Sequence, residues 1–123
     1  MIASDGRLVK LGEGHPHPRW YGTFPRVLGK YVREEGVLSL EEALYKMTAF
    51  PAQIMGLENR GRIEEGKKAD ITIFDPKTII DMATFEEPHQ YSKGIQYVLV
   101  NGKLAVDETV FMPIKSGEVL KKQ

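Results

Sequence analysis

The sequence contains no cysteine among its 123 residues, so disulfide bonds and zinc sites built on thiolates are both excluded. It also lacks net charge, because 17 basic residues balance 17 acidic ones, and no overall field favours nucleic acid or an anionic membrane. No apolar run approaches the roughly 20 residues of a membrane span, and no signal peptide is visible. We therefore expect a cytoplasmic globular protein that binds neither nucleic acid nor membranes.

Helical patterns dominate the first part of the chain. Thr23 is a suitable cap for a first helix that ends at Gly36. Ser39 and Glu42 have the spacing of a capping box, which predicts the start of a second helix. Residues 48–55 indicate a short third helix.

Short β-rich runs replace the helical pattern in the second part of the chain. Four strands are expected, at residues 61–63, 69–74, 95–100 and 103–106. Asn101-Gly102 favours the positive φ angles of a two-residue type I′ turn, so the last two strands should form a hairpin. The sequence thus predicts an α+β chain, with a helical part at 1–56 and an antiparallel β-rich part at 57–123.

The N-terminal stretch combines an apolar run with a carboxylate. Met1, Ile2 and Ala3 are followed by Ser4-Asp5-Gly6, a pattern that fits the tip of a buried strand opening into a loop. In α/β barrels, loops at the C-terminal ends of the strands build the active site. On its own, however, Asp5 is more simply interpreted as a turn or helix-cap residue, and both interpretations stay open at this point.

Residues 7–22 are rich in glycine and proline and are expected to form an irregular loop. Residues 15–21 of this loop, His-Pro-His-Pro-Arg-Trp-Tyr, are the densest group of chemically capable side chains in the chain. His15 and His17 have the spacing of a metal-binding pair on a strand. The intervening prolines disfavour a strand, and zinc takes three or four ligands. Loop packing or substrate contact is therefore preferred to a metal role.

Several motifs together indicate a family. Residues 4–6 read Ser-Asp-Gly, and residues 15–29 read His-Pro-His-Pro-Arg-Trp-Tyr-Gly-Thr-Phe-Pro-Arg-Val-Leu-Gly. The second part contains Gly61-Arg62-Ile63, Gly66, Ala69-Asp70, Phe74-Asp75-Pro76 and Val100-Asn101-Gly102. The first group resembles the closing region of the N-acyl-D-amino-acid deacylases (D-aminoacylases), and the second resembles the C-terminal signature of their superfamily, the amidohydrolases. The similarity runs through nearly the whole chain.

The resemblance implies a fold and a place for this chain within it. The superfamily has a (β/α)₈ metal-dependent hydrolase barrel that holds one or two metals, together with a β-sandwich assembled from both chain ends. On that template the chain is an α+β fragment. Residues 1–56 would be the last barrel strand with its active-site loop and helices. Residues 57–123 would be the C-terminal strands of the composite β-sandwich.

The resemblance also implies roles for individual residues. Asp5 matches the family aspartate at the end of the eighth barrel strand, beside the metal and its bound water. It would accept a proton from that water and pass one to the leaving amine, a task that suits a carboxylate within hydrogen-bond reach.

Arg19 is a candidate for holding the substrate carboxylate, because an arginine fork can bind a carboxylate bidentately. Arg26 is an alternative for that task, and a purely structural ion pair is equally compatible with the sequence. Asp70, Asn101 and Gly102 are expected to be structural residues at strand edges and turns.

The upstream metal ligands of the family are missing from this sequence. The expected His-x-His pair, a midway cysteine, lysine or glutamate, and two further histidines all precede the eighth strand. We therefore expect the C-terminal portion of a zinc-dependent deacylase that binds no zinc and does not act alone. Its partners would be the upstream part of the enzyme or further copies of itself, and N-acyl amino acids would be the substrates of the intact enzyme.

Two other functions are compatible with the same residues. The chain could be a stand-alone, non-catalytic module for oligomerisation or a subunit of a larger assembly, in which case Asp5 would be dispensable. It could also be a small ligand-binding domain that uses the loop at residues 15–21. Whether this chain is itself an enzyme is therefore open from the sequence.

Overall fold

The computed structural model describes residues 1–121, so Lys122 and Gln123 of the predicted β-rich part lie outside the described residues. The chain divides into two compact units, each assembled from two separate stretches. The helical unit contains residues 2–43 and 75–94, and the sheet unit contains residues 44–74 and the chain from residue 95 onward, together with Met1. The division predicted at residue 57 concerns the domains of a larger enzyme and stays a prediction.

One continuous helical rod runs through the helical unit. Helix α1 (Arg19–Arg26) passes directly into the π-helix η1 (Val27–Glu34). Pro25 lies inside α1 and supplies no backbone N–H, which weakens the regular α-helical ladder just before the change. At the end of η1, the Glu35 N–H donates to the Lys30 carbonyl at 2.9 Å, five residues back.

Small residues on this rod let another backbone segment approach closely. A Cβ at Gly29 would lie 2.5 Å from the carbonyl oxygen of Ile79, and one at Gly22 would lie 2.5 Å from the Asp81 Cβ. The Arg33 guanidinium donates to the same Ile79 carbonyl at 2.5 Å. Ile79 is the most deeply buried large side chain described, with 2% of its surface exposed. Two glycines seven residues apart therefore dock residues 79–81 on the rod.

The two following helices form as their capping signals predict. Helix α2 spans Leu40–Met47, and helix α3 spans Ala49–Met55. The Ser39 N–H donates to the Glu42 carboxylate at 3.1 Å, and the Glu42 N–H donates to the Ser39 hydroxyl oxygen at 3.1 Å. This reciprocal pair confirms the capping box. Gly56 ends α3 with a left-handed φ of 68°.

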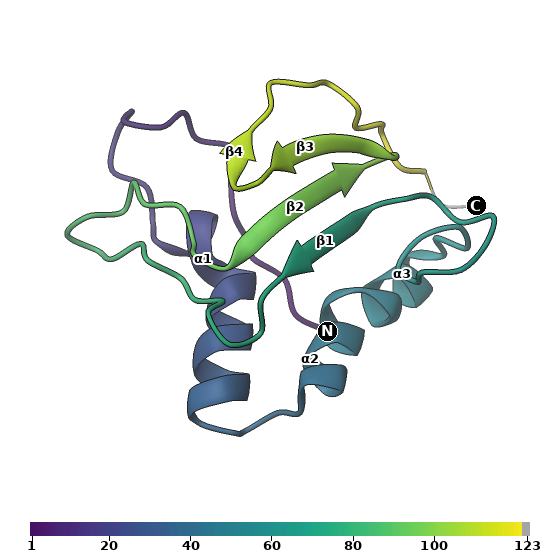
Figure 1. Ribbon diagram of the computed structural model, residues 1–123, viewed down its shortest axis with the longest axis horizontal. Coiled ribbons are helices and arrows are strands. Elements are labelled where there is room, and N and C mark those ends of the chain that lie inside the picture. Colours follow the sequence, from purple (N-terminus) through teal and green to yellow (C-terminus); the bar gives the residue numbers. More distant parts are fainter. Residues whose placement is uncertain (122–123) are drawn as a thin grey trace. The chain divides into compact units, whose positions relative to one another are not determined.

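A four-stranded antiparallel sheet forms the centre of the sheet unit (Figure 1). The strands lie in chain order: β1 (Ile71–Phe74), β2 (Ile95–Val100), β3 (Lys103–Asp107) and β4 (Val110–Phe111). Val100 pairs with Lys103 across the β2–β3 turn, where Asn101 and Gly102 have φ angles of 48° and 76°. The predicted Asn-Gly hairpin is therefore confirmed.

Two expectations from the sequence are corrected by the structure. The first helix begins at Arg19 rather than near Thr23, whose hydroxyl instead donates to the Arg19 carbonyl at 2.9 Å within the helix. Residues 61–63 form a bend and irregular chain rather than a strand, because Gly61 has a left-handed φ of 82°. Residues 1–10 pair with none of the four strands described in residues 1–121, so the strand tip expected at the start of the chain stays a prediction.

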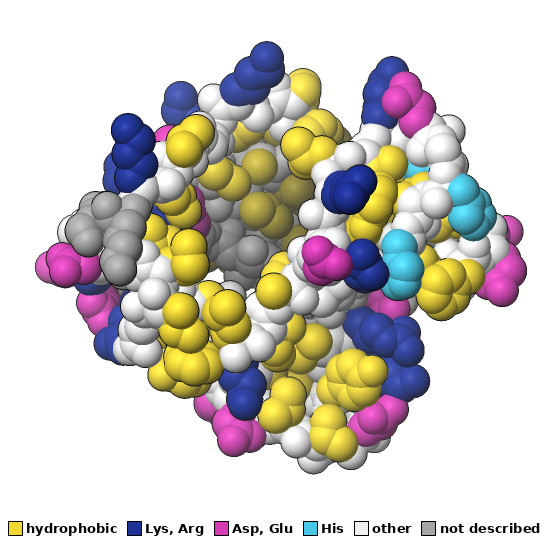
Figure 2. Space-filling view, turned by 180° about the vertical axis from the view of Figure 1, so that it is seen from behind, with side chains coloured by type: hydrophobic (Ala, Val, Ile, Leu, Met, Phe, Trp, Pro, Cys, Tyr) yellow, Lys and Arg dark blue, Asp and Glu magenta, His cyan; other side chains and the backbone are white. Residues whose placement is uncertain are grey.

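Little apolar surface is fully buried in the described chain. Six hydrophobic residues are buried: Val27, Leu28, Ala43, Ala52, Ile79 and Ala83. Large apolar side chains such as Leu8, Ile63 and Val119 are exposed at 104%, 85% and 88%, and Figure 2 shows hydrophobic side chains scattered over the visible face. Within residues 1–121, no helix is long and apolar enough to cross a membrane.

Replacing Gly61 by alanine should destabilise the sheet unit more than replacing Gly66. Both glycines have nearly the same φ, 82° and 81°, so both substitutions carry the left-handed penalty of about 1–2 kcal/mol. A Cβ at Gly61 would also lie 2.7 Å from the Ala52 Cβ, whereas nothing lies within 4 Å of one at Gly66. Overpacking should add about 1–3 kcal/mol for Gly61→Ala. Urea unfolding of both variants measures the difference, and equal losses would contradict this packing.

Candidate functional site

The structure brings Asp5 and Arg19 together in the helical unit. The Arg19 Nη2 lies 2.9 Å from the Asp5 Oδ2, and the Arg19 Nε donates to the Asp5 backbone carbonyl at 3.2 Å. The Asp5 side chain is 87% exposed and that of Arg19 is 43% exposed. Asp5 has a φ of 46°, a conformation that is unusual for a residue other than glycine. Arg19 therefore contacts both the main chain and the side chain of a strained aspartate.

The first turn of α1 positions Arg19. The His17 Nδ1 accepts a hydrogen bond from the Arg19 N–H at 3.1 Å, and the His17 carbonyl accepts one from the Trp20 N–H at 3.0 Å. His17 thus satisfies two of the backbone donors that an unaided helix start would leave unpaired. This capping also explains why the helix starts at Arg19 without a Ser, Thr, Asp or Asn at its first position.

A cavity of about 470 Å³ adjoins this turn. Its wall combines cationic, acidic and apolar side chains, including Arg19, Arg26, Asp81, Phe85 and Glu86. It is large enough for a small polar ligand with an apolar group.

Arg26 is occupied within this cavity wall. Its Nη1 lies 2.9 Å from the Asp81 Oδ2. Hydrogen bonding to the Asp81 carboxylate, and then to the Tyr31 hydroxyl, raises the pKa of Arg26 above its ordinary value. Because Arg26 is held by Asp81, Arg19 is the better placed of the two arginines to meet a ligand.

His15 and His17 make separate packing contacts rather than a shared site. The His15 Nε2 lies 2.7 Å from the Phe85 carbonyl oxygen, while the His17 ring meets the Phe85 ring edge-on with centroids 5.0 Å apart. Among residues 1–121, no three His, Cys, Asp or Glu side chains are grouped closely enough to hold a metal ion. The described residues therefore do not by themselves form the donor set that zinc requires.

Sequence reasoning missed His89 and its contact with Tyr21, which helps to fix this region. Tyr21 and His89 are hydrogen-bonded, with the phenol oxygen 2.9 Å from the His89 Nδ1. Burial, together with the nearby Tyr91, raises the pKa of Tyr21 above 10.0. The two residues are 68 positions apart, so no local spacing could have indicated the contact.

The motif residues Asp70 and Asn101 belong to a polar cluster around Arg60 in the sheet unit. The Arg60 guanidinium pairs with the Asp70 carboxylate and lies 2.9 Å from the Asn101 Oδ1 and 2.5 Å from a Glu118 carboxylate oxygen. Asp70 also accepts the Asn101 backbone N–H at 2.8 Å, and the Asn101 amide donates to the Ser116 carbonyl at 2.6 Å. Their role in this structure is to join the β2–β3 turn to neighbouring segments.

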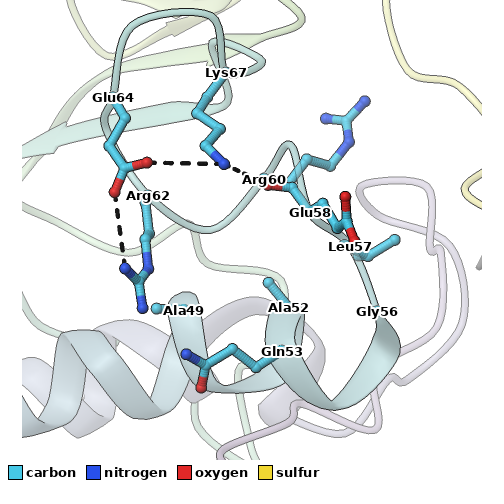
Figure 3. Close-up of a pocket in the computed structure, with 10 residues that line it drawn as sticks. All are labelled: Ala49, Ala52, Gln53, Gly56, Leu57, Glu58, Arg60, Arg62, Glu64 and Lys67. Carbon is cyan, nitrogen blue, oxygen red and sulfur yellow. Dashed lines mark hydrogen bonds and ion pairs between the residues drawn. The ribbon is translucent and has the colours of Figure 1, made fainter. Parts of the chain in front are cut away.

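A second cavity, of about 400 Å³, lies beside this cluster between α3 and the turn at residues 61–67 (Figure 3). Three of the charged groups along it, Arg62, Glu64 and Lys67, pair with one another. Lys67 Nζ lies 3.7 Å from a Glu64 carboxylate oxygen and donates to the Glu58 carbonyl at 2.5 Å, and Arg62 lies 3.8 Å from Glu64. Mutual pairing of this kind indicates a structural crevice rather than a charged binding site.

Comparison with known proteins identifies the family. Residues 2–106 match the model of the amidohydrolase family. The chain belongs to this family.

Two curated relatives show which members of the family this chain resembles. The chain is 51% identical over 102 residues to an N-acyl-D-glutamate deacylase and 45% identical over 122 residues to a D-aminoacylase, both from Alcaligenes xylosoxydans xylosoxydans. These matches cover 83% and 99% of this chain but only 20% and 25% of the relatives. This member of the amidohydrolase family therefore spans about a quarter or less of the curated relatives it matches.

Solved structures agree with the sequence relatives. A D-aminoacylase structure, described with a binuclear metal centre, superposes with a TM-score of 0.84 at 46% identity, covering 87% of this chain and 23% of that one. An N-acyl-D-glutamate deacylase from Bordetella bronchiseptica superposes with a TM-score of 0.73 at 49% identity, covering 74% of this chain and 19% of that one. That relative was solved with zinc and a phosphonate inhibitor that mimics the tetrahedral intermediate. The α+β fold with an antiparallel sheet is therefore shared with deacylases.

Removing Asp70 should destabilise the sheet unit far more than removing Glu118. The Arg60 side chain is only 9% exposed, so Asp70→Ala leaves a buried cation with one partner fewer and the Asn101 N–H without its acceptor. We expect a loss of about 2–3 kcal/mol in the free energy of unfolding.

Glu118→Ala is the matched control for Asp70→Ala. The Glu118 side chain is 50% exposed, so its ion pair with Arg60 should contribute less than about 1 kcal/mol. Urea denaturation of the two variants gives the comparison. A larger loss for Glu118→Ala would show that Asp70 is not the principal partner of Arg60.

Proposed function

We propose that this chain forms the C-terminal portion of a zinc-dependent N-acyl-D-amino-acid deacylase, an enzyme that hydrolyses the amide bond of N-acyl-D-amino acids. In this proposal, residues 1–56 supply the last strand, active-site loop and helices of a (β/α)₈ barrel. Residues 57–123 supply the C-terminal strands of a composite β-sandwich. The observation that carries the proposal is 45–51% identity to three deacylases, over 83–99% of this chain.

Asp5 is the proposed catalytic carboxylate, and it is also proposed to be one ligand of the metal ion. Its exposed side chain follows an apolar run and stands at the start of a loop, where a substrate can reach it. In the reaction it accepts a proton from the attacking water and returns a proton to the amine nitrogen as the amide C–N bond breaks. General acid–base help of this kind contributes about 10²- to 10⁴-fold to the rate.

Arg19 is the proposed binding residue for the free carboxylate of the substrate. Both of its contacts with Asp5 use the edge formed by Nε and Nη2. The edge formed by Nη1 and Nη2 can therefore face a second carboxylate in the bidentate geometry that a guanidinium favours. Arg19 would then fix the substrate carboxylate beside the residue that handles the proton.

The zinc of the proposed enzyme needs ligands beyond those described here. Asp5 alone is one oxygen donor, whereas zinc takes three or four protein ligands including nitrogen or sulfur. The rest of the donor set would come from the polypeptide that corresponds to the other three quarters of the relatives. For this reason we propose that the chain does not catalyse deacylation alone. Zinc-stimulated hydrolysis of N-acetyl-D-amino acids by the purified chain would contradict this proposal.

A chimeric enzyme tests the assignment of Asp5. This chain would replace the matching quarter of the D-aminoacylase relative, and kcat would be measured with N-acetyl-D-amino acids. We expect an active chimera that loses about 10²- to 10⁴-fold in kcat on Asp5→Asn. Glu41→Gln, an exposed carboxylate in the first turn of α2, should leave kcat unchanged. An active chimera that is indifferent to Asp5→Asn would refute the catalytic role and favour a non-catalytic module.

The same chimera tests Arg19 through substrate charge. Arg19→Lys should raise KM for an N-acyl amino acid about 10- to 100-fold more than for the matching uncharged amide, because lysine cannot reproduce the bidentate contact. A fall in kcat common to both substrates would report the second contact of Arg19, the one with Asp5. Equal KM changes for the two substrates would eliminate the binding role.

A further inference from the structure

All three histidines of the sequence lie in one contact region of the helical unit. The region joins the loop at residues 7–18 to the segment at residues 84–92. His15 and His17 both meet Phe85, the former through its Nε2 and the latter through its ring. His89, in the segment at residues 84–92, contacts Gly12 and Gly14 of the loop and Tyr21 of α1. This loop connects Asp5 to Arg19, so the contacts that hold it also set the positions of both proposed site residues.

His89 makes three hydrogen bonds, and together they assign its protonation state. Its Nε2 lies 3.1 Å from the Gly14 carbonyl oxygen, which can only accept, so Nε2 carries a proton. Its Nδ1 lies 3.2 Å from the Gly12 backbone nitrogen, which can only donate, so Nδ1 presents its lone pair. The Tyr21 hydroxyl, 2.9 Å from Nδ1, can donate to the same atom. In the neutral ring with its proton on Nε2, that proton goes to the Gly14 carbonyl, and the Gly12 N–H and the Tyr21 hydroxyl share the single lone pair of Nδ1.

A second proton on His89 would break this arrangement. Nδ1–H would then face the Gly12 N–H, two donors with no acceptor between them. The Tyr21 hydroxyl can rotate and accept a hydrogen bond, but the backbone of Gly12 cannot. Gly12 and Gly14 have φ angles of 83° and 68°, and nothing lies within 4 Å of a Cβ built on either. The Glu13 N–H donates to the Lys10 carbonyl at 3.0 Å within the turn itself, whereas the hydrogen bonds with His89 tie the turn to a distant segment.

His15 provides an internal contrast. Its Nε2 faces only the Phe85 carbonyl oxygen, at 2.7 Å. A proton on Nε2 donates to that oxygen in the neutral ring and in the cationic ring alike. Protonation of His15 therefore preserves its contact, whereas protonation of His89 removes one.

The loop is linked to α1 through Tyr21. The Tyr21 ring meets the His89 ring edge-on at 5.9 Å and the Tyr91 ring at 5.7 Å, and the Ser92 hydroxyl donates to the Tyr21 carbonyl at 3.2 Å. Tyr21 lies two residues after Arg19 in the same helix. The contacts of His89 thus fix the turn at residues 12–14 and the start of the helix that carries Arg19.

We infer that His89 is a positioning residue, whose neutral ring holds the loop between Asp5 and Arg19 and whose protonation releases the loop at Gly12. This inference rests on the proposed function for its effect on catalysis, but not for its effect on the loop. Of the other titratable or charged groups, Tyr21 on α1 contacts the His89 ring directly. Lys10 and Glu13 flank Gly12 in the sequence, and Glu87 and Tyr91 flank His89 in its own segment. Lys10 and Glu13 form an ion pair with each other at 2.7 Å, which limits their influence on the ring.

Amide hydrogen exchange of the 123-residue chain tests the release of the loop. The protection factor of Gly12, corrected for the intrinsic pH dependence of exchange, would be measured at a series of pH values between about pH 8 and pH 5. We expect protection to fall about tenfold in the unmodified chain, the size of one lost hydrogen bond. In His89→Asn, which offers an amide oxygen that does not titrate, protection should no longer depend on pH, whatever its level.

His15→Gln is the matched control, because glutamine keeps a donor for the Phe85 carbonyl. It should retain the full acid-induced fall. Protection that is constant in the unmodified chain, or that falls with acid in His89→Asn as it does without the substitution, would overturn the inference.

The chimeric enzyme gives an independent second readout. As the pH falls, KM for the N-acyl amino acid should rise with His89 present and stay flat in His89→Asn, while His15→Gln follows the unmodified chimera. If the pH dependence of KM is the same with and without His89→Asn, His89 has only a structural role. If the chimera has no deacylase activity at any pH, the proposed function fails, and the exchange measurement alone decides on His89.

Discussion

The burial of one guanidinium determines how the sheet unit is held together. Arg60 is 9% exposed and reaches Asp70 before β1, Asn101 in the β2–β3 turn and Glu118 near the end of the described chain. A buried cation is tolerated only where such partners surround it, because its desolvation is otherwise too costly. The hydrogen bonds and ion pairs of Arg60 therefore form only when its own segment and the segments of Asp70, Asn101 and Glu118 are all in place. The sheet unit depends on these contacts.

Local signals in the sequence predicted those parts of the fold that local chemistry determines. Ser39 and Glu42 cap α2 because both partners lie within one turn, and Asn101-Gly102 forms a hairpin because its positive φ angles fit a type I′ turn. The start of α1 was missed because the cap is supplied by His17, an atypical residue for this position. The strand expected at residues 61–63 fails because Gly61 adopts a left-handed conformation against α3.

Long-range contacts account for what the sequence did not reveal. No local pattern in the sequence indicates the roles of Arg60 and His89. Arg60 joins residues up to 58 positions away, and His89 joins residues up to 77 positions away. Asp5 and Arg19 were identified through family motifs, while their direct contact and the strained backbone of Asp5 became visible only in three dimensions. Composition does not indicate that only six hydrophobic residues are buried in the described chain, because the number of apolar residues does not determine how many of them are packed.

The two units are interleaved along the chain, and this order constrains how the protein can fold. The helical unit needs residues 75–94 in addition to residues 2–43, and the sheet unit needs residues 44–74 in addition to the chain beyond residue 94. Neither unit is complete when only the first half has left the ribosome, and β1 must wait for β2, more than twenty residues later, to find its partner. Such non-local pairing slows folding and leaves early segments unpaired. Cutting the chain near its middle would therefore yield two incomplete units rather than one intact unit and one tail.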